Sequence, residues 1–142
     1  DLGSGLILIS VVVDIERIGD YTKNIYELAI NHPKKLQGFS FEKDLLQIEI
    51  NTRNLFNDTI KTFKNQNLEE ARKIMKDYKK GISKQCDEIT NTIISSELDI
   101  DANSAAAIAL YSRYLKRISA HSRNLISSIV NPFERIGYPE EK

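Results

Sequence analysis

Apolar residues recur along the chain with the spacing of helices, and the clearest interruptions divide the sequence into four long segments. The first segment extends from about Leu2 to Asn31. Its valines at 11–13 are compatible with a strand, but the apolar positions repeat every three or four residues, which favours a helix. The repeat comprises Leu8, Val11, Val12, Ile15, Ile18, Ile25, Leu28 and Ala29. Pro33 cannot continue a helix and disfavours the helical state of the residue before it, so the segment ends near Asn31.

A second helix is predicted from Ser40 to about Lys64, after a polar linker that contains Gly38. Serine commonly caps helix N-termini, because its hydroxyl can accept a hydrogen bond from a free backbone N–H group. The apolar face of this helix comprises Leu45, Ile48, Leu55, Phe56, Ile60 and Phe63. Asn67 and Glu70 then have the spacing of a capping box, which predicts that another helix begins after a short break.

The third predicted helix carries the most regular apolar pattern of the chain. Its positions fall close to a seven-residue repeat, as expected where helices pack nearly antiparallel, and comprise Ala71, Ile74, Met75, Tyr78, Ile82, Cys86, Ile89 and Ile93. Met75 and the tyrosine of this stripe are therefore expected in the core. Gly81 lies within the stripe and destabilises a helix by about 1 kcal/mol relative to alanine. We expect local weakness or the close approach of a neighbouring helix there.

A fourth helix is predicted from Ala102 to about Val130, with Asp101 as its N-cap and Asn131 at its end, before a proline. Its alanines at 105–107 form helix readily and allow a neighbouring helix to come close. No segment has a convincing strand or hairpin pattern. The sequence therefore predicts an all-α fold, an antiparallel helical bundle of four long helices joined by short turns.

Composition restricts the class of protein. The 142 residues suffice for one domain, and the 20 basic and 20 acidic side chains cancel, so no overall charge attracts nucleic acid or an anionic membrane. The single cysteine, Cys86, excludes an internal disulfide and fits a reducing compartment. Its place on an apolar stripe favours a small buried side chain over a reactive thiol. The most apolar stretch, residues 6–15, is about half as long as a membrane-spanning helix.

Candidate chemistry lies in the first segment, in the string ERIGD that begins at Glu16. Residues four apart share a helix face, so Glu16 and Asp20 can present two carboxylates to one cation. Carboxylate oxygens suit hard or borderline divalent ions. The same spacing also occurs by chance on solvated helix faces, and the pair alone leaves both interpretations open. Its surroundings are unusual, because Gly19 is a poor mid-helix residue and Asn24 follows one turn later.

A longer string around this pair resembles a family signature. Residues 14–25 read DIERIGDYTKNI, which is similar to the signature D-L-E-R-I-G-D-x-A-x-N-I of PhoU proteins. The opening Asp1-Leu2 lies where that family has a D-L-R start to the same helix. A second, degenerate copy, LKRISAHSRNL, occupies residues 115–125. Two copies about a hundred residues apart match the family's internal repeat, in which each repeat is a three-helix unit ending in the signature helix.

The resemblance covers essentially the whole chain and implies two parts. Residues 1–33 resemble the signature helix of an incomplete first repeat, and residues 34–142 resemble a second three-helix repeat with a C-terminal tail. Because the chain begins without a methionine, we expect it to be a piece of a longer protein. If the two partner helices of the first repeat are missing, the apolar face of Leu6, Ile9, Val13 and their neighbours would be uncovered. We therefore expect a homodimer or larger assembly that buries this helix. The tail could dock on the bundle or on a partner, and both alternatives stay open.

The resemblance also implies a function. Members of the family restrain a high-affinity phosphate transporter and the sensor kinase coupled to it, as cytoplasmic scaffolds and not as enzymes. Some bind iron, zinc or other metals through E-x-x-x-D carboxylates. Carried over by position, Glu16 and Asp20 are the expected ligands for iron or zinc. The implied role is a metal-binding regulator of phosphate uptake and phosphate-responsive signalling, with a membrane phosphate transporter or sensor kinase as partner.

The second copy departs from the signature at the positions that would bind metal. Lys116 stands in place of the glutamate and Ala120 in place of the aspartate, so a second metal cluster is not expected. The basic group here comprises Arg113, Lys116, Arg117 and, one turn further on, His121. It is either a site for an anion or an acidic partner surface, or an ordinary solvated face. His121 is either a ligand or an ordinary hydrogen-bonding residue.

Other classes of protein fit the sequence less well. A di-metal carboxylate enzyme uses Glu-x-x-His pairs, and the two histidines, His32 and His121, belong to no such pair. The sequence has no Gly-rich nucleophile elbow or phosphate-cradling loop, so an enzyme is not expected. A histidine-kinase dimerisation helix would carry an acidic residue where Ser122 follows His121. One alternative stays open, a cytoplasmic PhoU-like regulatory domain of a sodium–phosphate cotransporter or another ion transporter, without metal.

Overall fold

A computed structural model of the chain describes residues 2–77, 81–131 and 135–140. The described elements are α1 (Leu2–Asn31), the 3-10 helix η1 (Phe39–Phe41), α2 (Glu42–Asn65), α3 (Leu68–Asp77), α4 (Gly81–Ser95) and α5 (Ala102–Val130). None of these residues lies in a strand. The all-α class and the bundle architecture predicted from the sequence are confirmed.

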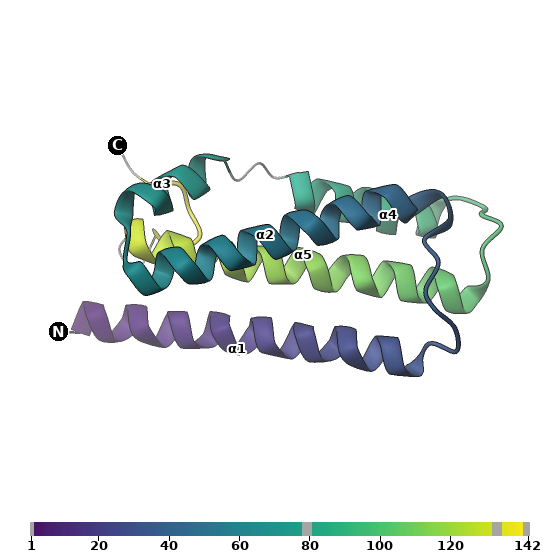
Figure 1. The fold of residues 1–142 in the computed structure, drawn as a ribbon, viewed down its shortest axis with the longest axis horizontal. Helices are drawn as coiled ribbons and strands as arrows, with labels where there is room; N and C mark the ends of the chain where they lie inside the picture. The colour runs from purple at the N-terminus through teal and green to yellow at the C-terminus, as the bar shows by residue number, and fades with distance from the viewer. Residues whose placement is uncertain (1, 78–80, 132–134, 141–142) are drawn as a thin grey trace.

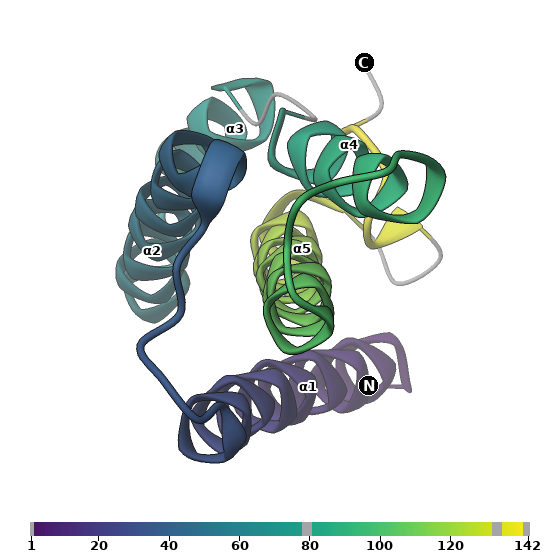
Figure 2. The same ribbon diagram turned by 90° about the vertical axis from the view of Figure 1, so that its right-hand side faces the viewer.

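The helices run back and forth along the long axis of the molecule, with α1 and the α3–α4 pair opposed to α2 and α5 (Figure 1). The end-on view places α5 in the centre, with α1 on one side and α2, α3 and α4 around the others (Figure 2). Among the described helices, α1 has an extensive backbone contact with α5 alone. The position of α1 therefore depends mainly on what its side chains meet on α5.

Two clusters of buried apolar side chains share α5. The larger cluster joins α2, α4 and α5 through Phe41, Leu45, Ile48, Ile82, Cys86, Ile89, Ile108 and Leu115. The smaller cluster joins α1 to α5 through Val11, Ile18, Ile118 and Leu125, with Phe56 and Phe63 of α2 packed against it. Burying an aliphatic side chain of this size stabilises the fold by roughly 1.5–3 kcal/mol.

Two of the three predicted helix starts are confirmed. The Ser104 N–H donates to Asp101 Oδ2 at 3.0 Å, so Asp101 caps α5. The Glu70 N–H donates to Asn67 Oδ1 at 3.1 Å, at the start of α3.

The prediction that Ser40 caps the second helix is wrong, because Ser40 lies inside η1 and α2 begins at Glu42. The Glu42 carboxylate instead accepts the Gly38 N–H. A Cβ at Gly38 would lie 2.5 Å from that carboxylate, so this turn requires glycine.

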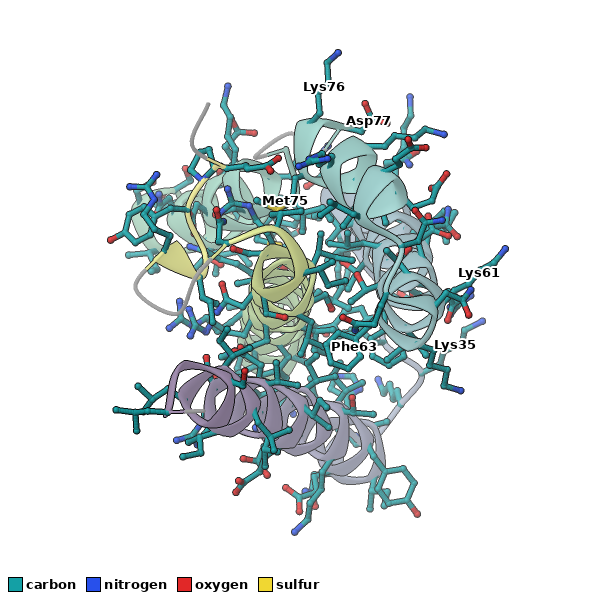
Figure 3. All side chains as sticks on the ribbon, turned by 90° about the vertical axis from the view of Figure 1, so that its left-hand side faces the viewer. Lys35, Lys61, Phe63, Met75, Lys76 and Asp77 are labelled. Atoms are coloured by element: carbon teal, nitrogen blue, oxygen red, sulfur yellow. The ribbon has the colours of Figure 1, made fainter. Side chains whose placement is uncertain are left out.

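The third predicted helix corresponds to α3, which ends at Asp77, and α4, which begins at Gly81, and residues 78–80 lie outside the described residues. Tyr78, predicted in the core, lies outside the described residues. A Cβ at Gly81 would meet nothing within 4 Å, so the predicted close approach of a neighbouring helix is wrong. Met75 is half-buried, whereas Lys76 and Asp77 beside it point outward (Figure 3).

The described part of the tail docks back on the bundle. The Gly137 N–H donates to Ser127 Oγ at 2.7 Å, and its carbonyl accepts from Arg123 Nη1 at 2.6 Å. Glu140 receives hydrogen bonds from both Nε and Nη2 of Arg72 on α3, with lengths of 2.8–3.0 Å. These contacts hold residues 135–140 against α5 and α3. Contact of the tail with a partner stays a prediction.

Candidate functional site

The two predicted metal ligands, Glu16 and Asp20, are exposed on α1, whereas Asp14 and Ile18 of the same helix are buried against α5. Asp20 Oδ2 lies 3.6 Å from Arg17 Nη1, and the Asp20 side chain is 52% exposed. Exposed ion pairs of this kind contribute little to stability. The two carboxylates are therefore free to serve a ligand or a partner from outside the bundle.

A metal ion needs more ligands than this pair supplies. Zinc sites in proteins hold the ion with three or four side chains, at metal–ligand distances near 2 Å. Within the ranges that the structure describes, no group of three His, Cys, Asp or Glu side chains is suited to holding a metal. Glu16 and Asp20 alone form an incomplete site, whose remaining ligands would come from outside the described residues. Metal binding at this pair stays a prediction.

The best-defined polar cluster joins α1 to α5 through Asp14, which is 6% exposed. Asp14 Oδ1 lies 2.7 Å from His121 Nδ1 and 3.2 Å from Asn124 Nδ2. A carboxylate oxygen can only accept, so both nitrogens donate to it. The buried charge thus has two donors, both contributed by α5. Such pairing is what makes a buried carboxylate tolerable.

Arg117 extends this cluster along α5. Its Nη2 lies 3.5 Å from His121 Nε2, a long contact. When the neutral ring carries its proton on Nδ1, Nε2 is an acceptor and can receive this N–H from Arg117. The guanidinium charge is then connected to the Asp14 carboxylate through a neutral imidazole.

Aromatic rings close the cluster from the side of α1. The Tyr21 ring stacks on the His121 ring with centroids 6.0 Å apart and an interplanar angle of 23°. Tyr114 lies on the other side, with its centroid 6.1 Å from that of Tyr21. The His121 side chain is 12% exposed, so it offers almost no surface to a substrate. The geometry suits fixing α1 on α5 better than acid–base chemistry.

The structure divides the predicted basic group. Lys116 Nζ is 2.7 Å from Asp87 Oδ1 of α4, so its charge is directed toward a different helix. Arg117 and His121 face α1 and are used in the Asp14 cluster. Arg113 is exposed. The four side chains are thus directed at different neighbours. Binding of an anion or an acidic partner by Arg113, Lys116, Arg117 and His121 stays a prediction.

Two members of the cluster, Asp14 and Asn124, were not among the residues singled out from the sequence. Both stand in the two signature copies, Asp14 as the first residue of one and Asn124 near the end of the other. Asp14 also lies four residues before Ile18 and three after Val11, both buried, and this spacing puts it on the apolar face of α1. A carboxylate on a buried face needs a hydrogen-bond partner. The place of Asp14 on the apolar face was therefore the sequence feature that could have identified it.

The thiol of Cys86 is confirmed as a core side chain, with 1% of its surface exposed. Burial, together with a smaller effect of the nearby Asp87 carboxylate, raises the pKa of Cys86 to about 12. A thiol with this pKa stays protonated at neutral pH, and the thiolate is the reactive form. The burial and the raised pKa of Cys86 both fit a packing role in the core.

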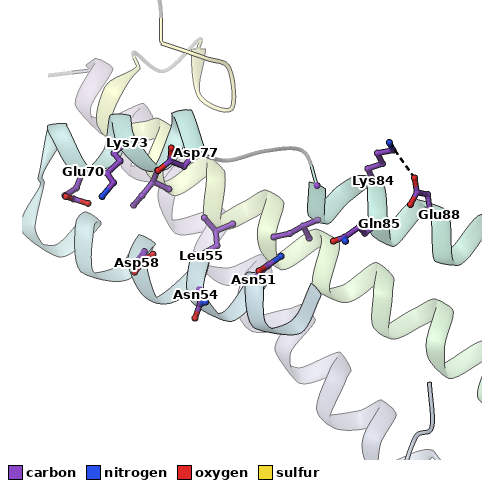
Figure 4. A pocket seen from close by; sticks show the side chains of 13 residues that line it. Asn51, Asn54, Leu55, Asp58, Glu70, Lys73, Asp77, Lys84, Gln85 and Glu88 are labelled. Carbon is purple, nitrogen blue, oxygen red and sulfur yellow. Dashed lines mark ion pairs between the residues drawn. The ribbon is translucent and has the colours of Figure 1, made fainter. Parts of the chain in front are cut away.

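A cavity of about 770 Å³ lies between α2, α3 and α4 (Figure 4). Its walls carry both signs of charge, including Asp58, Glu70 and Lys73, and Lys84 pairs with Glu88 across one turn of α4 at 3.8 Å. This mixture gives no consistent field for an ion of either sign. The cavity is a polar hollow between helices, and its residues define no particular chemistry.

Taken with the fold, these observations define a helical-bundle domain whose polar groups mainly join one helix to another. A family model described as the PhoU domain matches residues 46–129, which is more than half of the chain. The chain therefore belongs to the PhoU domain family, a regulatory, non-enzymatic family associated with phosphate transport. No curated protein and no solved structure matches the chain. Among the described residues, no helix is both long and apolar enough to cross a membrane.

Proposed function

We propose that this chain is a non-enzymatic regulator of phosphate uptake and phosphate-responsive signalling that acts as a cytoplasmic helical scaffold. Its partner is a membrane phosphate transporter or the sensor kinase coupled to it. Family membership supports the connection to phosphate transport. The observation that carries the scaffold role is the uncovered apolar face of α1, because a scaffold works through a surface that binds another protein.

This face, called the outer stripe below, consists of Leu8, Val12, Ile15 and Tyr26. These side chains are 62%, 54%, 49% and 67% exposed. Their spacing of three, four and eleven residues places them on one side of the helix. Several exposed apolar side chains on one side of a helix are typical of a protein–protein contact.

A groove beside α1 gives a partner a concave surface in addition to the outer stripe. A cavity of about 320 Å³ lies between α1, α2 and α5, with walls that include Ile18, Ile25 and Phe56. Because α1 has no extensive backbone contact with α2 in the described chain, this side of α1 stays open. A partner helix laid along α1 would cover the stripe and fill part of the groove, in the way amphipathic helices bind grooves.

The scaffold role is tested by removing apolar side chains from the outer stripe without disturbing the core. A Val12→Ser/Ile15→Ser variant is expected to lose binding to purified cytoplasmic segments of the transporter or kinase, and to derepress a phosphate-starvation reporter in cells. A Leu46→Ser/Ile50→Ser variant is the matched control, because those α2 side chains are also exposed, by 55% and 41%. The proposal is wrong if the α1 variant binds its partner and represses the reporter as well as the parent does.

Metal binding at Glu16 and Asp20 is the second part of the proposal. It is supported by the E-x-x-x-D spacing and by the exposure of both carboxylates. Elemental analysis of the purified chain is expected to find iron or zinc, and a Glu16→Ala/Asp20→Ala variant is expected to lose it. Glu69→Ala/Glu70→Ala removes two exposed carboxylates from α3 and serves as control. Equal metal content in all three proteins, or no metal in any of them, would contradict metal binding at Glu16 and Asp20.

One observation favours an alternative without metal. No third ligand accompanies Glu16 and Asp20 within the described ranges. A cytoplasmic PhoU-like regulatory domain of a sodium–phosphate cotransporter or another ion transporter would need the outer stripe but not the carboxylates. The same elemental analysis separates the two candidates. A metal-free chain that still binds a transporter segment through Val12 and Ile15 would support this alternative.

A further inference from the structure

The C-terminal segment, residues 135–140, is attached to the bundle through buried polar groups at the end of α5. The Ser127 hydroxyl oxygen accepts from the Gly137 N–H at 2.7 Å, and Asn131 Nδ2 donates to the Tyr138 carbonyl oxygen at 2.7 Å. Both α5 partners are buried, with exposures of 0% for Ser127 and 6% for Asn131. Losing these hydrogen bonds costs free energy, so the segment is part of the folded structure. We call it the strap.

The outer end of the strap is held by a contact that opens more easily. Glu140 accepts hydrogen bonds from Nε and Nη2 of Arg72 on α3, which lies at the same end of the molecule (Figure 1). The Arg72 and Glu140 side chains are 50% and 32% exposed. Salt therefore screens the pair, and water competes for its hydrogen bonds. The strap has a firm attachment on α5 and a labile one on α3.

Gly137 brings the backbone of the strap against Asn124 of α5. Its φ is +91°, a conformation that residues with a side chain disfavour. A Cβ on Gly137 would lie 3.0 Å from Asn124 Oδ1, closer than ordinary van der Waals contact. The preceding residue of α5, Arg123, donates from Nη1 to the Gly137 carbonyl oxygen at 2.6 Å. The strap thus occupies the space directly beside the Asn124 amide.

The other end of the same amide belongs to the attachment of α1. Asn124 Nδ2 donates to Asp14 Oδ1 at 3.2 Å. The carboxylate can only accept, so Nδ2 faces Asp14 and Oδ1 faces the strap. The second donor to Asp14 is His121 Nδ1, at 2.7 Å. The Asn124 side chain therefore lies between the strap on one side and α1 on the other.

We propose that the strap positions Asn124 and thereby controls how firmly α1 is held on α5. While the strap is docked, the Asn124 side chain has little room to rotate, and Nδ2 stays directed at Asp14. When the strap leaves, Asn124 gains rotamers in which this hydrogen bond is lost, and Asp14 keeps only His121 as donor. Among the described helices, α1 has an extensive backbone contact with α5 alone, so this loss loosens it.

The coupling makes the strap a regulatory element. Displacing a segment at one end of α5 would change the attachment of a helix on another side of it, because both bias one side chain with two arrangements. The helix affected is the one that carries the outer stripe. The use of this coupling by a protein partner rests on the proposed scaffold function, whereas the coupling itself rests on the contacts of Asn124.

The test is amide hydrogen exchange in the full chain, followed by NMR. Glu140→Lys replaces the ion pair with Arg72 by repulsion and is expected to free the outer end of the strap. Exchange at residues 11–25 of α1 is expected to be at least about threefold faster than in the parent. α4 has no extensive backbone contact with α1, so exchange at residues 81–95 is expected to stay as in the parent. Equal acceleration in both helices would show a general loss of stability and would overturn the proposal.

The Gly137 amide shows whether the strap has moved, because it is bonded to Ser127 Oγ. Its exchange is expected to be faster in Glu140→Lys. Glu97→Lys makes the same change of charge at an exposed position after α4 and is expected to leave α1 and the Gly137 amide as in the parent. A faster Gly137 amide with unchanged exchange in α1 would contradict the coupling.

Gly137→Ala acts on Asn124 without relying on the outer end of the strap. The added Cβ either displaces the Asn124 amide or moves the strap away from it, and each change weakens the hydrogen bond to Asp14. Exchange in α1 is expected to be about fivefold faster. Gly81→Ala is the control, because a Cβ at Gly81 meets nothing within 4 Å. Unchanged exchange in α1 of Gly137→Ala would overturn the proposal.

A double-variant cycle tests whether the coupling runs through Asn124. Asn124→Ala is expected to speed exchange in α1 by itself. In that background, adding Gly137→Ala is expected to change it by less than about twofold, because the shared side chain is absent. Additive effects would mean that the strap acts on α1 by another route and would contradict the role of Asn124. Such a failure would leave partner binding through Val12 and Ile15 unaffected, so the two proposals fail separately.

Discussion

Asp14 carries a charge inside the contact between two helices, at a position where an aliphatic residue would pack well. Its partners His121 and Asn124 are 107 and 110 residues away in sequence. An apolar contact such as Val11 and Ile18 against α5 tolerates small shifts of one helix along the other, whereas a two-donor contact to one carboxylate oxygen has a single good geometry. We infer that this cluster sets the register of α1 on α5.

Removing either side of this contact should therefore be costly. Asp14→Ala leaves the buried ring of His121 without its acceptor, and His121→Ala leaves Asp14 with Asn124 alone. Each single change is expected to lower the free energy of unfolding by about 2–4 kcal/mol. The double variant should cost less than the sum by about 1–2 kcal/mol, as for residues that share one interaction. Urea unfolding of the three variants at neutral pH measures this.

Asp20→Ala is the control for the Asp14 cycle, since Asp20 is an exposed carboxylate on the same helix. It is expected to change the free energy of unfolding by no more than about 0.5 kcal/mol. Additive effects of the Asp14 and His121 substitutions would contradict the proposed contact.

Cys86 gives the chain a specific sensitivity to alkaline pH. Its folded pKa is raised from 9.0 to about 12, so the unfolded thiol ionises first as pH rises. The unfolded state then binds fewer protons than the folded state, and stability falls between the two values. From pH about 8 to about 10, Cys86 alone should remove about 1 kcal/mol. Urea unfolding of the parent and of Cys86→Ala, at both pH values, isolates this contribution from that of other groups.

The Cys86→Ala variant is expected to be less stable than the parent at the lower pH, because it loses buried volume. The gap between the two proteins should narrow at the higher pH. A gap that stays constant would mean that the thiol titrates alike in the folded and unfolded states.

At the level of single residues, the sequence predicted what depends on local spacing. Asp101 and Asn67 were recognisable as caps because a cap acts on the backbone three residues away. The partner of Lys116 was not recognisable, because Asp87 lies on another helix. Spacing along one helix gives the face that a side chain occupies, but not which neighbour covers that face.

At the scale of elements, the same limit explains why one long helix was predicted over α3 and α4. Its apolar stripe continues with unchanged spacing from Ala71 through Ile82 to Ile89, and each of these is buried. The stripe therefore carried no mark of the boundary between α3 and α4. Gly81 was a visible weakness, but the pattern could not distinguish a thin place in one helix from the first residue of the next. The start of α2 was predicted wrongly because the side chain of Glu42, a residue of the helix itself, accepts the Gly38 N–H of the preceding turn.

Gly19 provides a test of α1 as an element. It lies inside the helix, and a Cβ there would meet nothing within 4 Å. Gly19→Ala is expected to raise the free energy of unfolding by about 0.5–1 kcal/mol, because alanine loses less backbone freedom on folding. Gly38→Ala is the contrasting variant and should destabilise, since its Cβ would clash with Glu42. Thermal unfolding compares both with the parent. Destabilisation by Gly19→Ala would mean that another chain lies closely against this position.

At the scale of the whole molecule, the four long segments are not equivalent. α5 contributes to both buried clusters, and α2, α3 and α4 surround it on the side away from α1 (Figure 2). The family match, residues 46–129, begins within α2 and ends within α5. α1 lies outside that match and is held by one face only. A helix held in this way can both complete the bundle and present its opposite face to another molecule.

The last prediction concerns that opposite face. With nothing else present, we expect two copies of the chain to pair through their outer stripes, because each copy buries the same apolar side chains of the other. Light scattering after size-exclusion chromatography should give a mass that rises from monomer toward dimer with concentration. Val12→Ser/Ile15→Ser removes four apolar contacts from a symmetric pair and should weaken association by at least about tenfold.

The Leu46→Ser/Ile50→Ser control should associate as the parent does, since those residues lie on α2. A parent chain that stays monomeric at every concentration, with the helical content expected for an intact α1, would contradict pairing. The outer stripe would then be a binding surface for a different protein. A competition experiment decides whether pairing and partner binding use the same surface. A transporter or kinase segment that binds α1 should dissociate the pair in proportion to its occupancy. The reason is that one face of a helix can be covered by only one neighbour at a time.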